Sequence, residues 1–184
     1  MGNLVTQTLF EIRLMRYSIS NWQEKKQKLL DLFDNSDMQL EEKQNCLSDY
    51  YTSSYRPKYF DEWYNILLDD FNELIPNLNL PCASKESWSL WTQIYRKGDS
   101  FTVHNHGYGK LSAILYFDFD HAKHTTTTFY CPFNNLINGS VEKNVISNIQ
   151  EGDIIFFPSA LAHECQVQTS DEFRRIMSFN IPME

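Results

Sequence analysis

The sequence lacks the features of a membrane-spanning chain and of a protein with a general affinity for nucleic-acid phosphates. Its 184 residues contain no run of 18 apolar residues, so no transmembrane helix is predicted. The segment 9–15 is interrupted by Glu11 and Arg13, so it is not expected to act as a secretory signal. The net charge of −8 and a pI near 5.1 argue against duplex nucleic acid and anionic membranes as partners.

Paired cysteines are also missing. The four cysteines form no C-x-x-C motif and have no regular spacing: Cys46, Cys82, Cys131 and Cys165. This pattern favours reduced thiols in a cytoplasmic protein, and it does not predict a structural zinc site.

What the chain does have is enough apolar material for one globular domain over residues 1–184. Hydrophobic residues make up 42% of the sequence and aromatic residues 15%, which is typical of a folded protein with a substantial core. The pattern divides this domain into two parts. Residues 1–86 are expected to supply an opening strand and supporting helices, and residues 87–184 a β-rich core with the functional site.

The first part shows mainly helical periodicity. The segment 8–17 favours the opening strand, and Ser20 is a candidate N-cap for the helix that follows. The polar stretch after it is ambiguous, with a short helix expected over 40–47. A clearer helix is predicted over 59–74 because its large apolar residues recur at helical spacing, and Pro76 is expected to end it.

The second part changes to the period of β-strands, with Gly, Asn, Asp and Pro at the turns. Eight short strands are predicted, over 88–95, 101–106, 111–119, 125–130, 141–149, 153–157, 163–168 and 174–181. This number and spacing favour a mainly β fold, an antiparallel jelly roll with flanking helices on one outer face. The threonines at 125–128 are expected on an exposed strand.

Three histidines form the most informative pattern. His104 and His106 make an H-x-H pair on a predicted strand, where alternate side chains share one face. His163 follows 57 positions after the second of them, so it can complete a three-point metal site on a β scaffold. His121 and His124, by contrast, are expected to be solvated residues of a loop.

An arginine follows the third histidine on a short predicted strand. Arg174 shares a face with Ser178, whereas Arg175 lies on the opposite, more apolar face, which is expected to pack against the helices. Arginine is the preferred side chain for binding a carboxylate through two hydrogen bonds. A metal-binding triad followed by such an arginine outlines an Fe(II) oxygenase that uses an α-keto acid.

Two hydroxyl-bearing residues are further candidates for this site. Ser112 and Tyr116 are four apart on one predicted strand and so share a face. If that face lines the interior of the barrel, their hydroxyls could bind the carboxylate of the cosubstrate. Ordinary core packing explains their positions nearly as well.

The order of five sequence blocks carries a specific resemblance. The blocks are Trp91-x-x-x-Tyr95-Arg96-Lys97-Gly98-Asp99, His104-x-His106, Leu111-Ser112-x-x-x-Tyr116-Phe117, Gly152-Asp153-Ile154-Ile155-Phe156-Phe157-Pro158-Ser159-x-x-x-His163 and Arg174-x-x-x-Ser178-Phe179-Asn180. Over residues 88–181 the chain resembles the putative 2-oxoglutarate-Fe(II) oxygenases of bacteria and tailed phages, relatives of the prolyl-hydroxylase-like enzymes. The resemblance implies a cupin-like double-stranded β-helix that holds Fe(II), with 2-oxoglutarate bound to the metal beside the substrate. It also implies the host cytoplasm as the location if a phage encodes the chain.

His106 departs from the wider superfamily, in which most members have Asp or Glu at this position. A neutral imidazole there leaves the Fe(II) site one positive charge higher, which should favour a dianionic cosubstrate. Three-histidine iron sites also occur in cupin thiol dioxygenases, which need no keto acid. His106 could instead turn away from the metal and leave two histidines and water.

The pattern and the resemblance together predict an Fe(II)- and 2-oxoglutarate-dependent oxygenase that hydroxylates a small molecule or a protein side chain and releases succinate and CO₂. His104, His106 and His163 are the predicted metal-binding and catalytic residues. Arg174 is predicted to bind the distal carboxylate of 2-oxoglutarate, helped by a hydroxyl of Ser178 or Tyr116. The alternatives are a keto-acid-independent three-histidine dioxygenase and a jelly roll that binds a metal or sugar without turnover.

Overall fold

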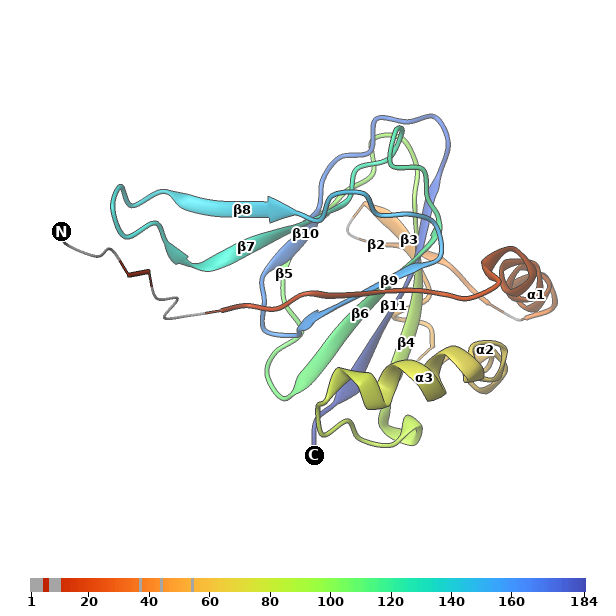
Figure 1. Cartoon of the computed structure of the whole chain (residues 1–184). Helices are drawn as coiled ribbons and strands as arrows, with labels where there is room; N and C mark the ends of the chain where they lie inside the picture. The colour runs from red at the N-terminus through yellow and green to blue at the C-terminus, as the bar shows by residue number, and fades with distance from the viewer. Residues whose placement is uncertain (1–4, 7–10, 37, 44, 54) are drawn as a thin grey trace.

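A computed structural model describes residues 5–6, 11–36, 38–43, 45–53 and 55–184. Two antiparallel sheets face each other, and the helices cover the outer face of the larger sheet (Figure 1). This is the double-stranded β-helix architecture that the strand pattern and the resemblance predict. No helix in the described part of the chain has the length and hydropathy needed to span a membrane.

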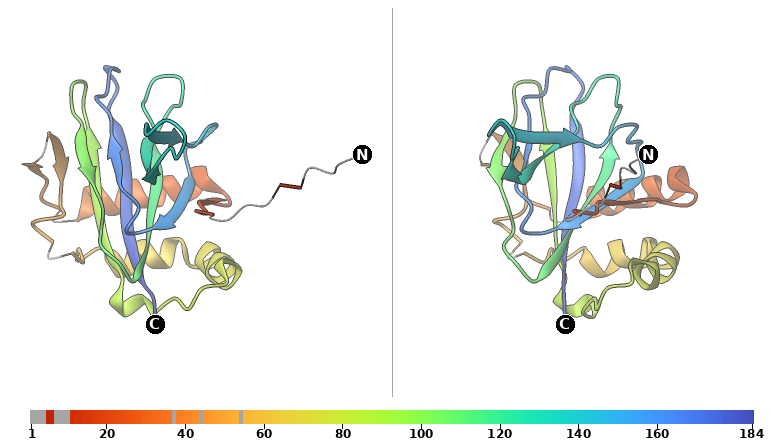
Figure 2. Two further views of the ribbon diagram at one scale, coloured as in Figure 1. Left: turned by 90° about the vertical axis from the view of Figure 1, so that its left-hand side faces the viewer. Right: turned by 60° about the vertical axis from the view of Figure 1, so that its left-hand side comes forward.

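The larger sheet has the strand order β1-β9-β6-β11-β4-β3-β2. Its strands are β1 (Met15–Ser18), β2 (Glu41–Lys43), β3 (Cys46–Ser48), β4 (Ser89–Tyr95), β6 (Lys110–Asp118), β9 (Asp153–Pro158) and β11 (Arg174–Pro182). The smaller sheet has the order β5-β10-β7-β8, formed by β5 (Phe101–His104), β7 (Thr127–Asn134), β8 (Val141–Val145) and β10 (His163–Cys165). Each of the eight predicted strand segments overlaps one of these strands. The β7–β8 hairpin extends outward on the left in Figure 1, away from the helices, and Figure 2 shows the sheets from two further sides.

Three α-helices pack on the larger sheet: α1 (Trp22–Asn35), α2 (Phe60–Ile66) and α3 (Leu68–Leu78). The side of β11 that faces them carries Met177, Phe179 and Ile181, all fully buried. The ring of Trp63 on α2 lies 5.3 Å from that of Phe179, centroid to centroid. Burial of each such side chain contributes roughly 1.5–3 kcal/mol, so this layer supplies much of the stability.

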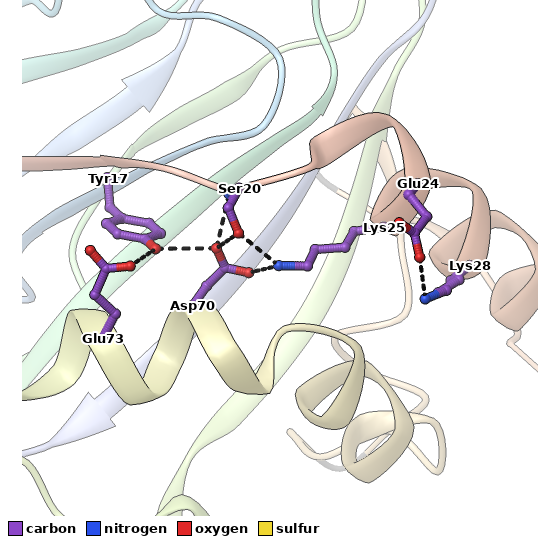
Figure 3. A network of polar contacts seen from close by, with 7 residues as sticks. All are labelled: Tyr17, Ser20, Glu24, Lys25, Lys28, Asp70 and Glu73. Atoms are coloured by element: carbon purple, nitrogen blue, oxygen red, sulfur yellow. Dashed lines mark hydrogen bonds and ion pairs between the residues drawn. The ribbon is translucent and has the colours of Figure 1, made fainter.

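A polar network fixes the helices to the sheet edge (Figure 3). Asp70 on α3 accepts hydrogen bonds from the backbone N–H of Ser20 at 2.9 Å and from the hydroxyl of Tyr17 at 3.1 Å, and it forms an ion pair with Lys25. Burial alone would raise the pKa of Asp70, but the hydrogen bonds from Lys25 and Ser20 outweigh it and lower that pKa. The carboxylate therefore joins the end of β1, the start of α1 and the first turn of α3.

The first part of the chain differs from the prediction in several places. The opening strand is shorter than 8–17, since β1 begins at Met15 and residues 8–10 lie outside the described residues. Ser20 does not cap α1: the N-cap is Asn21, in the left-handed conformation at φ 50°, and the hydroxyl of Ser20 bonds Asp70 instead. The predicted helix over 40–47 was wrong, because β2 and β3 pair there as a hairpin.

The long helix predicted over 59–74 is divided into α2 and α3 at Leu67. Pro76 does not end α3 but lies inside it. Proline removes one backbone donor yet keeps its carbonyl, which accepts a hydrogen bond from the N–H of Asn79 at 3.3 Å. Asn79 then ends the helix in the left-handed conformation at φ 57°.

Candidate active site

The three predicted histidines come together between the sheets. Their ligand atoms all lie within 4.8 Å of one another, a spacing that could hold one metal ion. His104 ends β5 and His163 begins β10, and the two residues are direct partners across these antiparallel strands. Their ring centroids are 4.3 Å apart, and that of His106 lies 5.1 Å from His104 and 5.2 Å from His163.

Backbone contacts orient two of the rings. Nδ1 of His104 lies 2.8 Å from the carbonyl oxygen of Thr102, and Nδ1 of His163 lies 2.9 Å from that of Leu161. A carbonyl only accepts, so each Nδ1 carries the hydrogen when the ring is neutral. The lone pair of each ring is therefore on Nε2, where it is free to bind a metal.

His106 reaches the cluster in a different way from that predicted. β5 ends at His104, so His106 is on the following loop and not on the same strand. Its backbone N–H donates to the carbonyl of Ser159 at 2.8 Å, which ties this loop to the end of β9. The ring of His106 also packs beside that of Trp91, with a centroid separation of 5.4 Å.

Burial keeps all three rings uncharged at neutral pH. Desolvation lowers the pKa of His104, lowers that of His106 to about 4 and lowers that of His163 to about 3. A metal ion binds the neutral form of imidazole, so these donors need not lose a proton first. Three such nitrogens form a donor set that suits iron, zinc or copper.

Arg174 is the second unusual feature of this region. Its side chain is fully buried, with 0% exposed, on the side of β11 that faces the smaller sheet. Nη1 lies 3.2 Å from Sγ of Cys165, and Nη2 lies 3.4 Å from Oγ1 of Thr127. The guanidinium also faces the rings of Tyr95 and Tyr116, at 5.0 and 5.4 Å from their centroids.

No carboxylate of the described residues pairs with Arg174, and its Nε has no hydrogen-bond partner among them. Burial raises the pKa of the Cys165 thiol, so this neighbour is neutral at pH 7 and supplies no negative charge. A buried cation is costly unless an anion compensates it. The arginine therefore fits an anionic ligand that enters from the cavity.

The hydroxyls predicted to assist Arg174 divide into two groups. The hydroxyl of Tyr116 donates to Oγ1 of Thr127 at 3.0 Å, so it belongs to the surroundings of Arg174. Ser178 instead donates to Oε1 of Gln93 at 3.3 Å, and Ser112 donates to Asn180 at 2.6 Å. Both serines line the same cavity as the histidines but do not contact Arg174.

The cavity connects these groups and has a volume of about 180 Å³. All three histidines line it, as do Thr127 and Cys165, which touch Arg174. The three histidine donors, which could hold a metal ion, and the environment of the buried cation therefore open onto one space.

Thr127 and Cys165 were not predicted as site residues. The prediction of exposed threonines was wrong for Thr127 and Thr128, which are 3% and 2% exposed. The sequence contained one usable signal: Cys165 is two residues after His163, so both share a face of the same strand. His124 was also predicted wrongly as solvated, since it is buried and its Nδ1 accepts from the N–H of Asp120 at 3.0 Å.

The sequence matches a protein family over residues 89–180, half of the chain. The family is described as "Putative 2OG-Fe(II) oxygenase". The matched segment runs from β4 to β11 and includes the three histidines and Arg174. The sequence has no significant match among curated proteins.

Solved structures share the fold at low sequence identity. A Pseudomonas putida prolyl-4-hydroxylase has a TM-score of 0.59 at 12% identity, with 94% of each chain covered. HygX from Streptomyces hygroscopicus, with nickel and 2-oxoglutarate bound, has a TM-score of 0.64 at 11% identity, covering 94% of this chain and 83% of its own. A Trichoplax adhaerens prolyl hydroxylase in complex with a hypoxia inducible factor peptide has a TM-score of 0.59 at 14% identity, covering 92% and 83%.

Proposed function

Because the chain belongs to the "Putative 2OG-Fe(II) oxygenase" family, we propose that it hydroxylates a substrate in a reaction that consumes 2-oxoglutarate and O₂ and releases succinate and CO₂. The observation that carries this proposal is a single cavity between two groups of residues. One group is the cluster of three neutral histidines, and the other surrounds a buried arginine without an anionic partner among the described residues.

His104, His106 and His163 would hold the Fe(II). The donor set fits this ion, since imidazole nitrogen is a common ligand of non-haem iron and all three rings are neutral. When bound, the metal and 2-oxoglutarate supply the oxygen activation that the protein's side chains cannot perform.

Arg174 would bind the distal carboxylate of 2-oxoglutarate. The carboxylate would complete the charge balance of the buried guanidinium, with the hydroxyl of Thr127 beside it as a donor and Tyr116 orienting that hydroxyl. Such a fixed ion pair would hold the cosubstrate in one orientation. The aromatic side chains that line the cavity, such as Trp91, Phe101 and Phe157, would exclude water from the reacting atoms. Ser112 and Ser178 are retained as candidate contacts, but each would have to release its present partner to take part.

The whole chain, residues 1–184, would act as one oxygenase domain. A single apolar cluster joins helical residues of the first part, such as Trp63 and Phe71, to β11 residues of the second, such as Phe179. The helices therefore complete the core on which the strands that carry the site depend.

The proposed substrate is a small molecule or a protein side chain. Related structures contain both kinds of ligand: HygX has been solved with hygromycin B bound, and the Trichoplax enzyme with a peptide.

A second candidate is a keto-acid-independent dioxygenase. The presence of a third histidine in place of a carboxylate favours it, since iron held by three neutral imidazoles needs no carboxylate ligand from the protein. Arg174 argues against it, because that reaction gives the buried cation no cosubstrate carboxylate to bind.

The decisive test is succinate production by the anaerobically iron-loaded protein after addition of 2-oxoglutarate and O₂, with His163→Ala as the control. We expect slow formation of succinate by the wild type without a substrate, and none by the variant. Binding of 2-oxoglutarate should be measured in the same samples. A wild type that neither binds 2-oxoglutarate nor forms succinate would contradict the proposal and favour the second candidate.

A further inference from the structure

The two ends of the cavity differ in charge. Among its lining residues that the structure describes, Glu164 is the only acidic one and none is lysine or arginine; the Glu164 carboxyl group accepts a hydrogen bond from the hydroxyl of Tyr130 at 2.6 Å. Glu164 alternates along β10 with the inward-facing His163 and Cys165, so its side chain belongs to the other side of the sheet. The buried cation Arg174 lies behind the lining residues Thr127 and Cys165, which it contacts, and this is the inner end of the cavity. The outer end, beside His106, has no cationic side chain among its described lining residues, and the cation that acts on His106 is the solvent-exposed Lys110.

Aromatic rings form one wall of this outer end. The ring of Trp91, beside His106, lies 5.1 Å from that of Tyr50, centroid to centroid. The ring centroid of Tyr50 lies 4.9 Å from those of both Tyr51 and Tyr55, whose side chains are 47% and 56% exposed. This aromatic wall (Trp91, Tyr50, Tyr51 and Tyr55) therefore runs without interruption from His106 to the solvent.

Buried hydrogen bonds fix the wall in place. Asp49, which is 2% exposed, accepts from the backbone N–H of Thr92 at 2.7 Å and from the hydroxyl of Tyr59 at 2.5 Å. Ser48 donates to the carbonyl of Thr92 at 2.9 Å. These contacts join the turn that follows β3 to β4, the strand beside it in the larger sheet (Figure 2), so Tyr50 and Trp91 are held together before any ligand arrives.

Gln93 adds a directed polar group at the base of the wall. Its Oε1 accepts from the indole N–H of Trp91 at 3.2 Å and from Ser178 at 3.3 Å. An indole N–H can only donate, so this contact fixes which end of the amide is the oxygen. The Nε2 group, with two hydrogens to donate, has a single acceptor among the described residues, the weak Sγ of Cys46 at 3.9 Å. Gln93 is 7% exposed and lines the cavity, so it has a donor to spare for a ligand.

We propose that the outer end of the cavity binds an uncharged ring that carries a hydrogen-bond acceptor such as a carbonyl oxygen, with the ring against Tyr50 and Trp91 and the acceptor bonded to Gln93. The inference rests on the proposed function, because the nearby histidines make this ring the group presented for oxidation. A charged group there would lose its hydration without a buried counter-ion among the described residues, since the Glu164 carboxylate is bonded to Tyr130 and Lys110 is exposed to solvent. A cation on the aromatic faces is further disfavoured because Oε1 of Gln93 already accepts from Trp91 and Ser178, which leaves the amide N–H as the group that Gln93 can offer a ligand.

Three probes of nearly equal shape test the charge preference: benzamide is neutral, benzoate is anionic and benzamidinium is cationic. Their binding to the full chain loaded with Zn(II) and 2-oxoglutarate, which does not turn over, would be measured by calorimetry or ligand-observed NMR. We expect benzamide to bind at least about tenfold more tightly than either charged probe. Equal or tighter binding of benzoate or benzamidinium would overturn the inference. So would the absence of benzamide binding at a concentration of about 10 mM, at which even a weak complex is detected.

Variants test the named residues. Tyr50→Leu removes the central ring and should weaken benzamide binding roughly fivefold or more, whereas Tyr50→Phe keeps the ring and should leave it unchanged. Gln93→Met removes the donor and should weaken benzamide binding roughly three- to tenfold. Unchanged benzamide affinity in both Tyr50→Leu and Gln93→Met would overturn the inference.

The affinity for 2-oxoglutarate, measured in each sample, separates the two proposals and reports on folding. A variant that binds 2-oxoglutarate as the wild type does has kept its fold and its inner site. If the wild type binds 2-oxoglutarate without preferring benzamide, only the inference about the ring fails. If the wild type does not bind 2-oxoglutarate, the proposed function fails.

Discussion

Two neighbouring arginines on β11 lie in opposite environments. Arg175 faces the helical layer, where it pairs with Asp118 at 3.2 Å and contacts the rings of Phe33 and Phe117. Arg174 faces the smaller sheet, where it contacts Thr127 and Cys165 of the cavity lining; it is fully buried and has no carboxylate partner among the described residues. The protein supplies the counter-charge of the structural arginine but not that of its neighbour, which indicates that the partner of Arg174 is a ligand.

The same contrast extends to the two faces of the larger sheet. The helix-facing side is packed with aromatic rings, whereas the cavity-facing side carries polar side chains such as Gln93, Ser178 and Asn180. The helix-facing side should therefore determine stability and the cavity-facing side should determine binding. The following predictions test this division, from the largest expected effect to the smallest.

Trp63→Ala should cause the largest loss of stability. Trp63 is fully buried and its ring packs against Phe60, Phe71 and Phe179. Removing it should lower the free energy of unfolding by about 3–5 kcal/mol, measured by urea denaturation. If the variant remains folded, its affinity for 2-oxoglutarate should stay near the wild-type value. A loss of that affinity in the folded variant would show that the two faces are not independent.

Arg174→Met should weaken 2-oxoglutarate binding by about 2–5 kcal/mol, roughly 30-fold to several thousand-fold, while metal binding is retained. Arg175→Met is the matched control and should change this affinity only a few-fold. Stability should respond in the opposite way: Arg174→Met should leave it unchanged or raise it, because a buried unpaired charge is removed. Arg175→Met should lower it, because an ion pair and ring contacts are lost. The reverse pattern in the two variants would mean that the roles of the strand faces have been exchanged.

Asp70→Asn should lower stability by about 1–3 kcal/mol at pH 7, because Asp70 accepts bonds from two chain segments and pairs with Lys25. The pKa of Asp70 is lowered in the folded state, so its stabilising effect is present above the unfolded value of about 3.9 and is lost as the pH falls through the folded value. The difference in thermal stability between wild type and variant should therefore begin to shrink as the pH falls below about 4. Lys28→Ala, which breaks the exposed Glu24–Lys28 pair in the same region, should change stability by no more than about 0.5 kcal/mol. An equal effect of both changes would refute a special role for the buried carboxylate.

Tyr116→Phe should have the smallest effect. Its hydroxyl bonds Thr127 near Arg174, so its loss should weaken 2-oxoglutarate binding by about 0.5–1.5 kcal/mol, measured by calorimetry. Ser112→Ala serves as the comparison, because Ser112 bonds Asn180 and has no contact with Arg174. A larger effect of Ser112→Ala than of Tyr116→Phe would indicate that the cosubstrate carboxylate binds near Ser112 and Asn180 and not near Arg174.

Local periodicity was sufficient to predict much of the fold. Alternating apolar residues located every strand of the second part, and the two-residue period by itself placed Arg174 and Arg175 on opposite faces of their strand. The prediction for the first part of the chain failed where the sequence has no clear hydrophobic periodicity. β2 and β3 form in a polar segment because β3 pairs with β4, Leu47 opposite Ile94, and this pairing is a tertiary contact that local sequence cannot reveal.

The site shows the same limit. The spacing of the histidines indicated their cluster, although His106 arrives from a loop and not from the strand. Of the neighbours of Arg174, Tyr116 was among the candidates from the sequence, but Thr127 and Cys165 were not, because they approach it from two strands of the other sheet. Which hydroxyl lies beside a given cation depends on strand order and register, and these are fixed only when the two sheets pack.

The most direct test of the central claim is a crystal structure of the chain prepared anaerobically with Fe(II) and 2-oxoglutarate. The account predicts metal density bound by nitrogens of His104, His106 and His163, at roughly 2.0–2.3 Å. It also predicts the distal carboxylate of 2-oxoglutarate at the guanidinium of Arg174. Metal bound elsewhere, or a cosubstrate whose carboxylate lies away from Arg174, would contradict it.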